Sequence, residues 1–273
     1  MAATRALTAT PAGRVAFVGA GPGQADLITL RGAQRLAQAA VVLSDALADP
    51  ALRELAPHAR WLHVGKRGFA DSTGQEAINA LLIKCAREVG STGLVVRLKG
   101  GDPSVFGRLE EELQAMAAAG IACEVVPGVT AALAAAAAAQ RPLTRRGSGR
   151  SVSFTTAMTR SGEVQATRSA DTEVFYMAGK QLAALSRRLI EAGWPSDTPA
   201  SVVSRAGWPD QLHSDHTVAT LARAALLHAG RPSVVTVGAG AMPLRCSGQA
   251  LEREPSQAIQ PHTPSVRVGS LNP

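Results

Sequence analysis

The chain has 273 residues, of which 46% are hydrophobic, so it is long enough for two modest domains or one large one and can bury a substantial core. No run of about 18 apolar residues occurs, so we expect no membrane span; aromatic residues make up only 3%, which weighs against single-stranded nucleic acid bound on aromatic platforms. The net charge of +7 indicates an anionic partner, either nucleic acid or a polyanionic small molecule, although arginine-rich and alanine-rich chains are often basic without special function.

The cysteine pattern and the N-terminal residues give predictions about the cellular compartment. Cys85, Cys123 and Cys246 are odd in number, far apart and without C-x-x-C spacing, so they predict neither a disulfide framework nor a zinc site. A reducing, cytoplasmic location fits this usage. Residues 1–13 contain no acid and no apolar stretch of signal-peptide type, and we expect them to form a flexible tail.

Strand and helix patterns alternate through the first half of the chain. Apolar, β-branched runs predict strands, and runs with helical spacing predict helices; the strands are expected over 14–19, 40–45, 61–66, 94–98 and 122–126, and the helices over 30–39, 75–87 and 106–119. Such alternation is typical of a parallel sheet with crossover helices. We therefore expect residues 14–127 to form an N-terminal α/β domain.

Several unusual residues follow the strands of this predicted sheet. Gly19 to Gly23 follows the first strand, Asp45 ends the second, Lys66 ends the third and Gly100 to Asp102 follows the fourth. Glycines let the backbone approach a ligand or take a positive φ. Because ligands bind beyond the carboxyl ends of such strands, we expect these residues to meet at one site.

A second α/β domain is expected over residues 128–241, after a break at Pro127-Gly128. Thr130 can cap an alanine-rich helix over 131–140, and a basic loop follows over 141–146. Further strands are predicted over 152–155, 173–177, 200–204 and 233–237, with helices over 181–192 and 217–229. From residue 242 to 273, Pro, Ser, Gln and Arg accumulate without periodicity, which predicts a disordered tail.

Two motifs suggest other chemistries. Gly19-Ala20-Gly21-Pro22-Gly23 resembles a dinucleotide fingerprint, but the third glycine of that fingerprint would fall at Gln24, and Pro22 removes a donor N–H. His213-Ser214-Asp215-His216 offers three potential metal ligands at very short spacing, for which a polar loop is the better interpretation. Neither motif makes a nicotinamide-dependent oxidoreductase or a metal enzyme the favoured hypothesis.

Basic residues flank the loops expected at the site. Arginine forks bind carboxylates in bidentate fashion, so a small polyacid would suit a rim of this kind, which we expect to draw on Arg97, Lys99, Arg108, Arg141, Arg145 and Arg146. Solvated surface charge is the alternative, and it is favoured for Arg145. Glu111 lies one helical turn after Arg108 and can pair with it.

The ordered motifs resemble those of the tetrapyrrole methylases over roughly Arg14 to Gly240. The resemblance rests on Val-Gly-Ala-Gly-Pro-Gly at 18–23, Val-Gly-Lys-Arg at 64–67, Val-Arg-Leu-Lys-Gly-Gly-Asp-Pro at 96–103, Phe-Gly-Arg at 106–108, Val-Val-Pro-Gly-Val-Thr-Ala at 125–131, Pro-Leu-Thr at 142–144 and Phe-Tyr-Met at 175–177. It implies a two-domain α/β methylase fold with S-adenosylmethionine in the interdomain cleft. Within the family, the chain is most similar to the members that methylate uroporphyrinogen III.

The resemblance also implies roles for individual residues. The cofactor contacts would map to Pro22, Gly100, Gly101, Asp102, Val105, Thr130, Ala131, Met177 and Ala206. The proton acceptor and donor would be Asp45 and Lys66, while Arg108, Glu111 and Arg146 would contact or orient the substrate.

The implied activity is transfer of two methyl groups to uroporphyrinogen III, giving precorrin-2 for sirohaem, cobalamin or haem d1, with S-adenosylhomocysteine as by-product and no metal. The partners would be a polycarboxylate tetrapyrrole and a second copy of the chain, with no membrane and no nucleic acid. The alternatives are a sibling methylase acting on a later corrinoid, a protein or an RNA, a nicotinamide-dependent oxidoreductase, and a nucleic-acid-binding module without catalysis.

The chain departs from the usual family pattern at three places. Gln24-Ala25 stands where Asp-Pro is usual, and Ser44-Asp45-Ala46-Leu47-Ala48 stands where Tyr-Asp-Arg-Leu-Val is usual. Leu109-Glu110 replaces a pair of glycines after Arg108.

Overall fold

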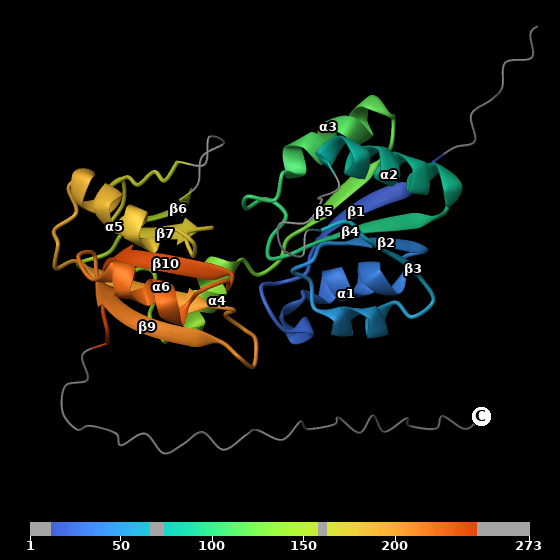
Figure 1. The fold of residues 1–273 in the computed structure, drawn as a ribbon. Coiled ribbons are helices and arrows are strands. Elements are labelled where there is room, and N and C mark those ends of the chain that lie inside the picture. Colours follow the sequence, from blue (N-terminus) through green and yellow to red (C-terminus); the bar gives the residue numbers. More distant parts are fainter. Residues whose placement is uncertain (1–11, 66–73, 158–162, 245–273) are drawn as a thin grey trace, which may run out of the picture. The chain divides into compact units, whose positions relative to one another are not determined.

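The computed structural model describes residues 12–65, 74–157 and 163–244. The residues up to Met242 form one compact unit, which contains two five-stranded sheets (Figure 1). No described helix is long and apolar enough to cross a membrane.

The first sheet is wholly parallel, as the alternating pattern predicts. Its strand order is β3-β2-β4-β1-β5, with β1 at Arg14–Gly19, β2 at Val41–Ser44, β3 at Arg60–His63, β4 at Leu94–Lys99 and β5 at Cys123–Val126. The strand β4 lies between β1 and β2, and all six of its residues are buried. The loops after β1, β2 and β4 therefore emerge side by side.

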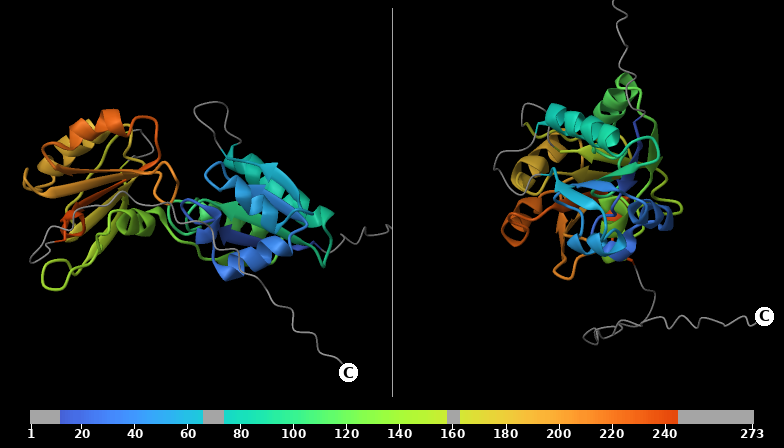
Figure 2. Two further views of the ribbon diagram at one scale, coloured as in Figure 1. Left: turned by 90° about the horizontal axis from the view of Figure 1, so that it is seen from below. Right: turned by 90° about the vertical axis from the view of Figure 1, so that its right-hand side faces the viewer.

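Helices cover both faces of this sheet (Figures 1 and 2). One face packs on α1 (Leu30–Ala37) and the 3-10 helix η2 (Pro50–Leu55), and the other packs on α2 (Gln75–Glu88) and α3 (Leu109–Ala118). A shorter 3-10 helix, η1 (Ala25–Leu27), precedes α1. Successive β4 residues alternate between the two faces, so Val95 packs beneath α2 and α3 while Val96 packs on the opposite side.

The second sheet is mixed, with the order β6-β7-β10-β8-β9. Its strands are β6 (Val152–Thr156), β7 (Thr172–Tyr176), β8 (Pro199–Ser204), β9 (Leu212–Thr217) and β10 (Ser233–Gly238). Only the β6–β7 pair is parallel among these described pairings. The helix α4 (Ala131–Ala138) packs on one face and α5 (Leu182–Glu191) on the other.

Two predictions for this half are wrong. The segment from His213 to His216 is not a loop but most of β9, and the helix expected over 217–229 is reduced to the 3-10 turn η3 (Leu221–Arg223) and α6 (Ala224–Leu227), because Thr217 still belongs to β9. The chain ends its described part after the 3-10 helix η4 (Ala239–Ala241). The predicted tails fall almost entirely outside the described residues, as does Cys246.

Candidate functional site

A cavity of about 640 Å³ lies where the loops of the first sheet meet residues of the second half. All nine positions assigned to the cofactor by the family resemblance are among its lining residues, namely Pro22, Gly100, Gly101, Asp102, Val105, Thr130, Ala131, Met177 and Ala206. Asp45 lines it as well. Residues far apart in sequence, from Gly21 to Val234, thus contribute to one pocket of a size typical of small-molecule sites.

The glycine turns after β1 and β4 are bonded directly to one another. The Gly101 N–H donates to the Gly21 carbonyl at 2.7 Å, and the Gly21 N–H donates to the Gly101 carbonyl at 3.2 Å. A Cβ atom on Gly19 would lie 2.6 Å from the Gly128 Cα, which no real side chain tolerates. The glycines are therefore required for the backbones to cross at the cavity, apart from any contact with a ligand.

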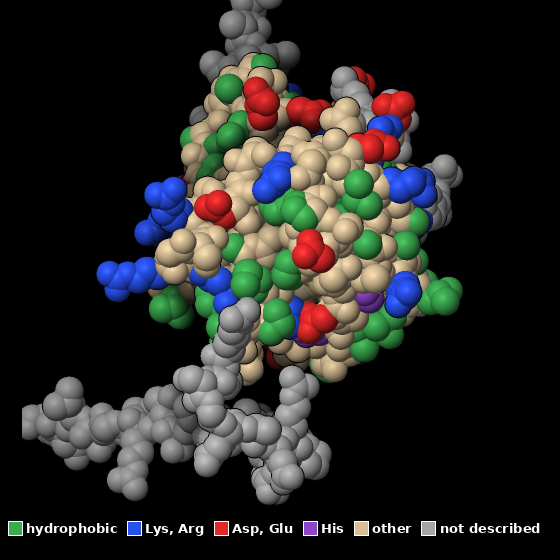
Figure 3. All heavy atoms as spheres, turned by 90° about the vertical axis from the view of Figure 1, so that its left-hand side faces the viewer, with side chains coloured by type: hydrophobic (Ala, Val, Ile, Leu, Met, Phe, Trp, Pro, Cys, Tyr) green, Lys and Arg blue, Asp and Glu red, His purple; other side chains and the backbone are tan. Residues whose placement is uncertain are grey.

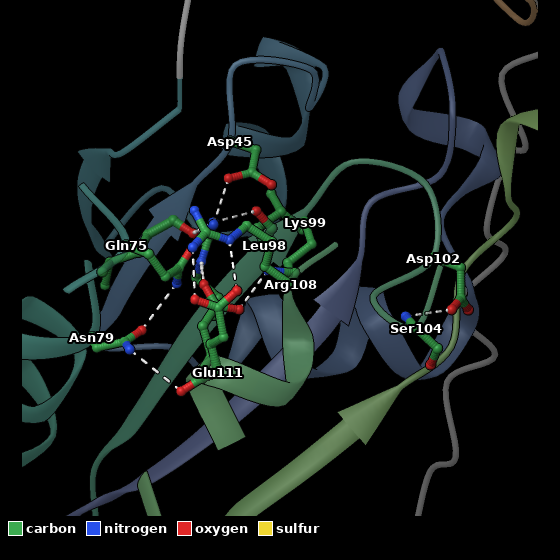
Figure 4. A network of polar contacts seen from close by, with 12 residues as sticks. Asp45, Gln75, Asn79, Leu98, Lys99, Asp102, Ser104, Arg108 and Glu111 are labelled. Atoms are coloured by element: carbon green, nitrogen blue, oxygen red, sulfur yellow. Dashed lines mark hydrogen bonds and ion pairs between the residues drawn. The ribbon is translucent and has the colours of Figure 1, made fainter. Parts of the chain in front are cut away.

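Asp102 holds the loop after β4 in place. Its Oδ1 accepts a hydrogen bond from the Ser104 N–H at 2.8 Å, and its Oδ2 accepts one from the Gly128 N–H at 2.9 Å (Figure 4 shows the first). The second bond joins the loop after β4 to the loop after β5. Each oxygen retains a second lone pair, so Asp102 can still accept from a ligand.

Backbone strain is concentrated around the cavity. Among the described residues, five non-glycine residues have positive φ, and three of them, Phe106, Met177 and Arg205, line the cavity. A fourth, Arg108, is the second residue after Phe106. Strained conformations of this kind cost roughly 1–3 kcal/mol each and cluster at ligand sites, so their placement is independent support for a functional role.

Tyr176, the only tyrosine of the chain, lines the cavity, although the sequence patterns gave it no role beyond its place in the Phe-Tyr-Met motif. Its hydroxyl lies 2.7 Å from the Thr130 Oγ1 and accepts a hydrogen bond from the Ala132 N–H at 3.2 Å. Burial raises the pKa of this phenol, and its ring packs 5.0 Å from that of Phe106. Tyr176 therefore ties the start of α4 to the end of β7; its position directly before Met177 was the available signal.

Asp45 lines the cavity and forms an ion pair with the buried Arg97. Its Oδ1 accepts from the Arg97 Nη2 at 2.6 Å, and its side chain is 27% exposed (Figure 4). The expectation that Arg97 belongs to an exposed basic rim is wrong, because its side chain is 3% exposed and paired internally. Lys99 is also buried, but it lines the cavity. Lys66 lies outside the described residues.

The residues assigned to the substrate lie away from the cavity lining. Arg108 donates to both carboxylate oxygens of Glu111, at 2.7 and 2.6 Å, on the exposed first turn of α3, so the pairing expected from their spacing is present. Arg146 is exposed in the loop after α4. On the face drawn in Figure 3, Lys and Arg side chains lie among Asp and Glu side chains and do not form a single patch.

The His213–His216 segment is held by pairs rather than by a metal-like cluster. Arg141 donates to both oxygens of Asp215, at 2.5 and 2.6 Å, and the Ser214 hydroxyl lies within 2.9 Å of the ring nitrogens of His216 and His228. Within the described ranges, no group of three or more His, Cys, Asp or Glu residues could hold a metal ion. Arg141, at 8% exposure, is a structural residue and not part of an open basic rim.

Comparison with known proteins identifies the relatives of the chain. The family profile "Tetrapyrrole (Corrin/Porphyrin) Methylases" matches residues 14–223. The chain is 40% identical over 231 residues to a uroporphyrinogen-III C-methyltransferase of Pseudomonas aeruginosa, covering 83% of this chain and 93% of the relative. It is 46% identical over 232 residues to Siroheme synthase 1 of Yersinia pseudotuberculosis, covering 83% of this chain but 48% of that protein. The chain thus spans about half the length of the siroheme synthases that it matches.

A solved structure is similar across nearly the same region. The crystal structure of a uroporphyrin-III C-methyltransferase from Thermus thermophilus, complexed with S-adenosylhomocysteine, matches with a TM-score of 0.72 and 34% sequence identity, covering 83% of this chain and 97% of the other. The two-sheet α/β fold described above is therefore shared with a protein that binds the by-product of S-adenosylmethionine.

Proposed function

Since the chain belongs to the tetrapyrrole methylase family, we propose that it transfers methyl groups from S-adenosylmethionine to carbon atoms of uroporphyrinogen III, giving precorrin-2. One observation carries the proposal. The nine positions that the resemblance assigns to the cofactor are brought into one cavity from three loops and two strand ends, and Asp45 opens into the same cavity. Two relatives support this substrate, because one is named a uroporphyrinogen-III C-methyltransferase and the other a siroheme synthase.

The cavity suits S-adenosylmethionine by size and chemistry. Its volume of about 640 Å³ lies within the range of roughly 300–1,000 Å³ that small-molecule sites occupy. The residues proposed to hold the cofactor are Gly100 to Asp102, Thr130 and Ala131, which offer backbone groups and one carboxylate, and Met177, which offers a soft apolar wall. When bound, S-adenosylmethionine supplies an electrophilic methyl group carried by a cationic sulfur.

The residues around the methyl-transfer position would orient the substrate and move a proton. Once a ring carbon has gained a methyl group, a proton must leave the macrocycle, and the Asp45 carboxylate is the proposed acceptor. Lys66 is the proposed donor. Arg108 and Arg146 are proposed to meet substrate carboxylates, for which Arg108 must share or exchange its bond with Glu111. Much of the rate would come from holding carbon, methyl and sulfur in line.

A nicotinamide-dependent oxidoreductase is less well supported. In a dinucleotide-binding fold the glycine turn leads directly into a helix whose N-terminus faces the pyrophosphate. Here the turn after β1 pairs with Gly101, a 3-10 turn intervenes at Ala25–Leu27, and α1 begins only at Leu30.

The reaction itself is the test. Purified protein would be incubated anaerobically with S-adenosylmethionine and enzymatically prepared uroporphyrinogen III, and the products analysed by mass spectrometry. Mono- and dimethylated products are expected. If the protein binds S-adenosylmethionine but leaves uroporphyrinogen III unmethylated, the substrate is wrong and later corrinoids, proteins and RNA become the candidates.

Binding measurements separate the remaining classes. Titration with S-adenosylmethionine and with nicotinamide cofactors distinguishes the methyltransferase from the oxidoreductase, and nucleic-acid binding that weakens steeply with salt would favour a binding module. Replacement of Asp45 or Lys66 by alanine should lower turnover strongly if they transfer protons; unchanged turnover would leave them structural.

The assembly and location carried over from the resemblance are part of the proposal. We propose a homodimer in the cytoplasm; light scattering of the purified chain tests the first, and fractionation of the cells that make it tests the second.

A further inference from the structure

Four charged side chains of alternating sign form a continuous row beneath the cavity (Figure 4 shows part of it). Asp45 Oδ1 lies 2.6 Å from Arg97 Nη2, Arg97 Nε lies 2.9 Å from Glu112 Oε1, and Glu112 Oε2 lies 2.5 Å from Lys99 Nζ. Asp45 and Lys99 line the cavity, whereas Arg97 and Glu112 are not among its lining residues. The row therefore begins and ends at the cavity and runs through the protein between.

The strand periodicity explains how the row is built. Arg97 and Lys99 are two positions apart on β4, so both side chains point to the face that α3 covers. Glu112 projects from α3 onto this face and is the only acid of its first turns that is buried, with 0% exposure; Glu110 and Glu111 are exposed or partly so. One carboxylate thus serves two buried cations at once.

Glu112 neutralises the buried charges of Arg97 and Lys99 and fixes the position of the Arg97 guanidinium. Two cations close together in a dry environment repel, and an ion buried without a partner is strongly unfavourable. Arg97 is further held by the carbonyls of Leu43 and Leu98, at 3.4 and 3.2 Å. With its guanidinium fixed by Glu112 on one side and these carbonyls on the other, Arg97 presents Nη2 to Asp45 in a single position.

We propose that Glu112 is a positioning residue for methyl transfer: through Arg97 it fixes the Asp45 carboxylate at the cavity, and through its other oxygen it holds the Lys99 Nζ beside the same cavity. This inference rests on the proposed function. Glu112 itself is not among the residues that line the cavity.

The electrostatics of Lys99 provide a readout for this role. Burial lowers the pKa of the Lys99 ammonium, and the neighbouring Arg97 lowers it further, while Glu112 and Asp45 oppose the shift. Among the described residues, these three are the charged groups that act on Lys99, from its own strand, from α3 and from the end of β2. Loss of the Glu112 charge should therefore let Lys99 release its proton at lower pH.

The test compares Glu112→Gln, which keeps the shape but not the charge, with Glu110→Gln, an exposed acid on the same helix that contacts Gln114. We expect Glu112→Gln to lower kcat by about 100-fold, to leave the KM for S-adenosylmethionine within about twofold, and to move the alkaline limb of the kcat–pH profile down by about one pH unit. Glu110→Gln should match the wild type in all three.

A second variant keeps the inference falsifiable if Glu112→Gln does not fold. Lys99→Arg retains a cation that does not titrate below about pH 12, so it should move the alkaline limb to higher pH while preserving measurable turnover. A wild-type kcat and pH profile in Glu112→Gln, or an unchanged alkaline limb in Lys99→Arg, would overturn the inference while leaving the proposed function intact. If the wild-type protein gives no methylated tetrapyrrole, the proposed function fails and the inference fails with it.

Discussion

Replacement of Asp102 by asparagine should destabilise the protein, because the carboxylate connects two loops at the cavity. Its two oxygens accept from the N–H groups of Ser104 and Gly128, at 2.8 and 2.9 Å. Asparagine has one acceptor oxygen, so one backbone N–H would face an NH₂ group instead. A hydrogen bond to a charged acceptor contributes roughly 1.5–3 kcal/mol, and we expect a loss of about that size in the free energy of unfolding.

Urea denaturation measures this loss. With a urea m-value of roughly 2–3 kcal/mol/M for a chain of this length, the midpoint should fall by about 0.5–1.5 M without a change in m. Asp197→Asn, at an exposed acid of the second half, is the matched control and should leave the midpoint unchanged. Calorimetric titration should show S-adenosylmethionine bound about tenfold more weakly by Asp102→Asn. A midpoint within about 0.2 M of the wild type would refute the view that Asp102 fastens these loops.

Three further outcomes follow from the same region and from the second sheet. Tyr176→Phe removes both hydroxyl contacts at the start of α4 and should cost about 1–2 kcal/mol in thermal unfolding and weaken S-adenosylmethionine binding severalfold; an unchanged affinity would contradict a role in shaping the cavity. Gly19→Ala places a Cβ 2.6 Å from the Gly128 Cα and should cost about 3 kcal/mol or prevent folding, whereas Gly74→Ala, with nothing within 4 Å, should be neutral by the same denaturation assay. Burial, and then the charges of nearby groups, lower the pKa of His228 below its usual 6.5. The unfolded chain therefore binds more protons than the folded protein between that value and the folded pKa. The contribution of His228 to the free energy of unfolding should be lost as the pH drops below 6.5, so the measured fall should be smaller in His228→Gln.

The first sheet was predictable because its signals are strong and agree with one another. The strands β1, β2 and β4 are almost wholly buried and give continuous apolar runs, and helices with clear spacing follow β1, β3 and β4, so a parallel sheet follows from the alternation. The observed β1 and β4 begin and end within one residue of the predicted strands. Asp45 and Gly100 to Asp102 were expected at the site for the same reason, since loops after parallel strands must emerge at one edge, whereas cavity residues of the second half, such as Met177 and Ala206, were implied only by the family resemblance.

The second sheet was less predictable because β9 lies at its edge. Its burial alternates weakly, and four of its six residues are His, Ser or Asp, which single-sequence reasoning assigns to loops. Pairing with β8 stabilises it, and cross-strand polar contacts such as Ser201 to His213 replace apolar packing. Contacts of that kind join residues distant in sequence and leave no periodic signal.

The buried cations of the site were also only partly predictable from the sequence. A cation near a glycine loop is expected to lie at the site, and Lys99 lines the cavity. Arg97, two residues earlier, has the same local pattern but is enclosed by Glu112 and Asp45. Only the packing of α3 against β4 separates a buried structural cation from one at a rim.

The departures from the family pattern differ in whether they line the cavity. Leu109 packs into the core beneath α3, and Glu110 points away from the row of buried charges, so replacing the usual glycine pair leaves Glu112 in place. Gln24 does not line the cavity. Ala46 does, directly beside Asp45 at a position where the family resemblance leads us to expect arginine, and Asp45 is paired with Arg97. Ala46 is therefore the departure that lies at the cavity, whereas Leu109 and Glu110 begin α3 outside its lining.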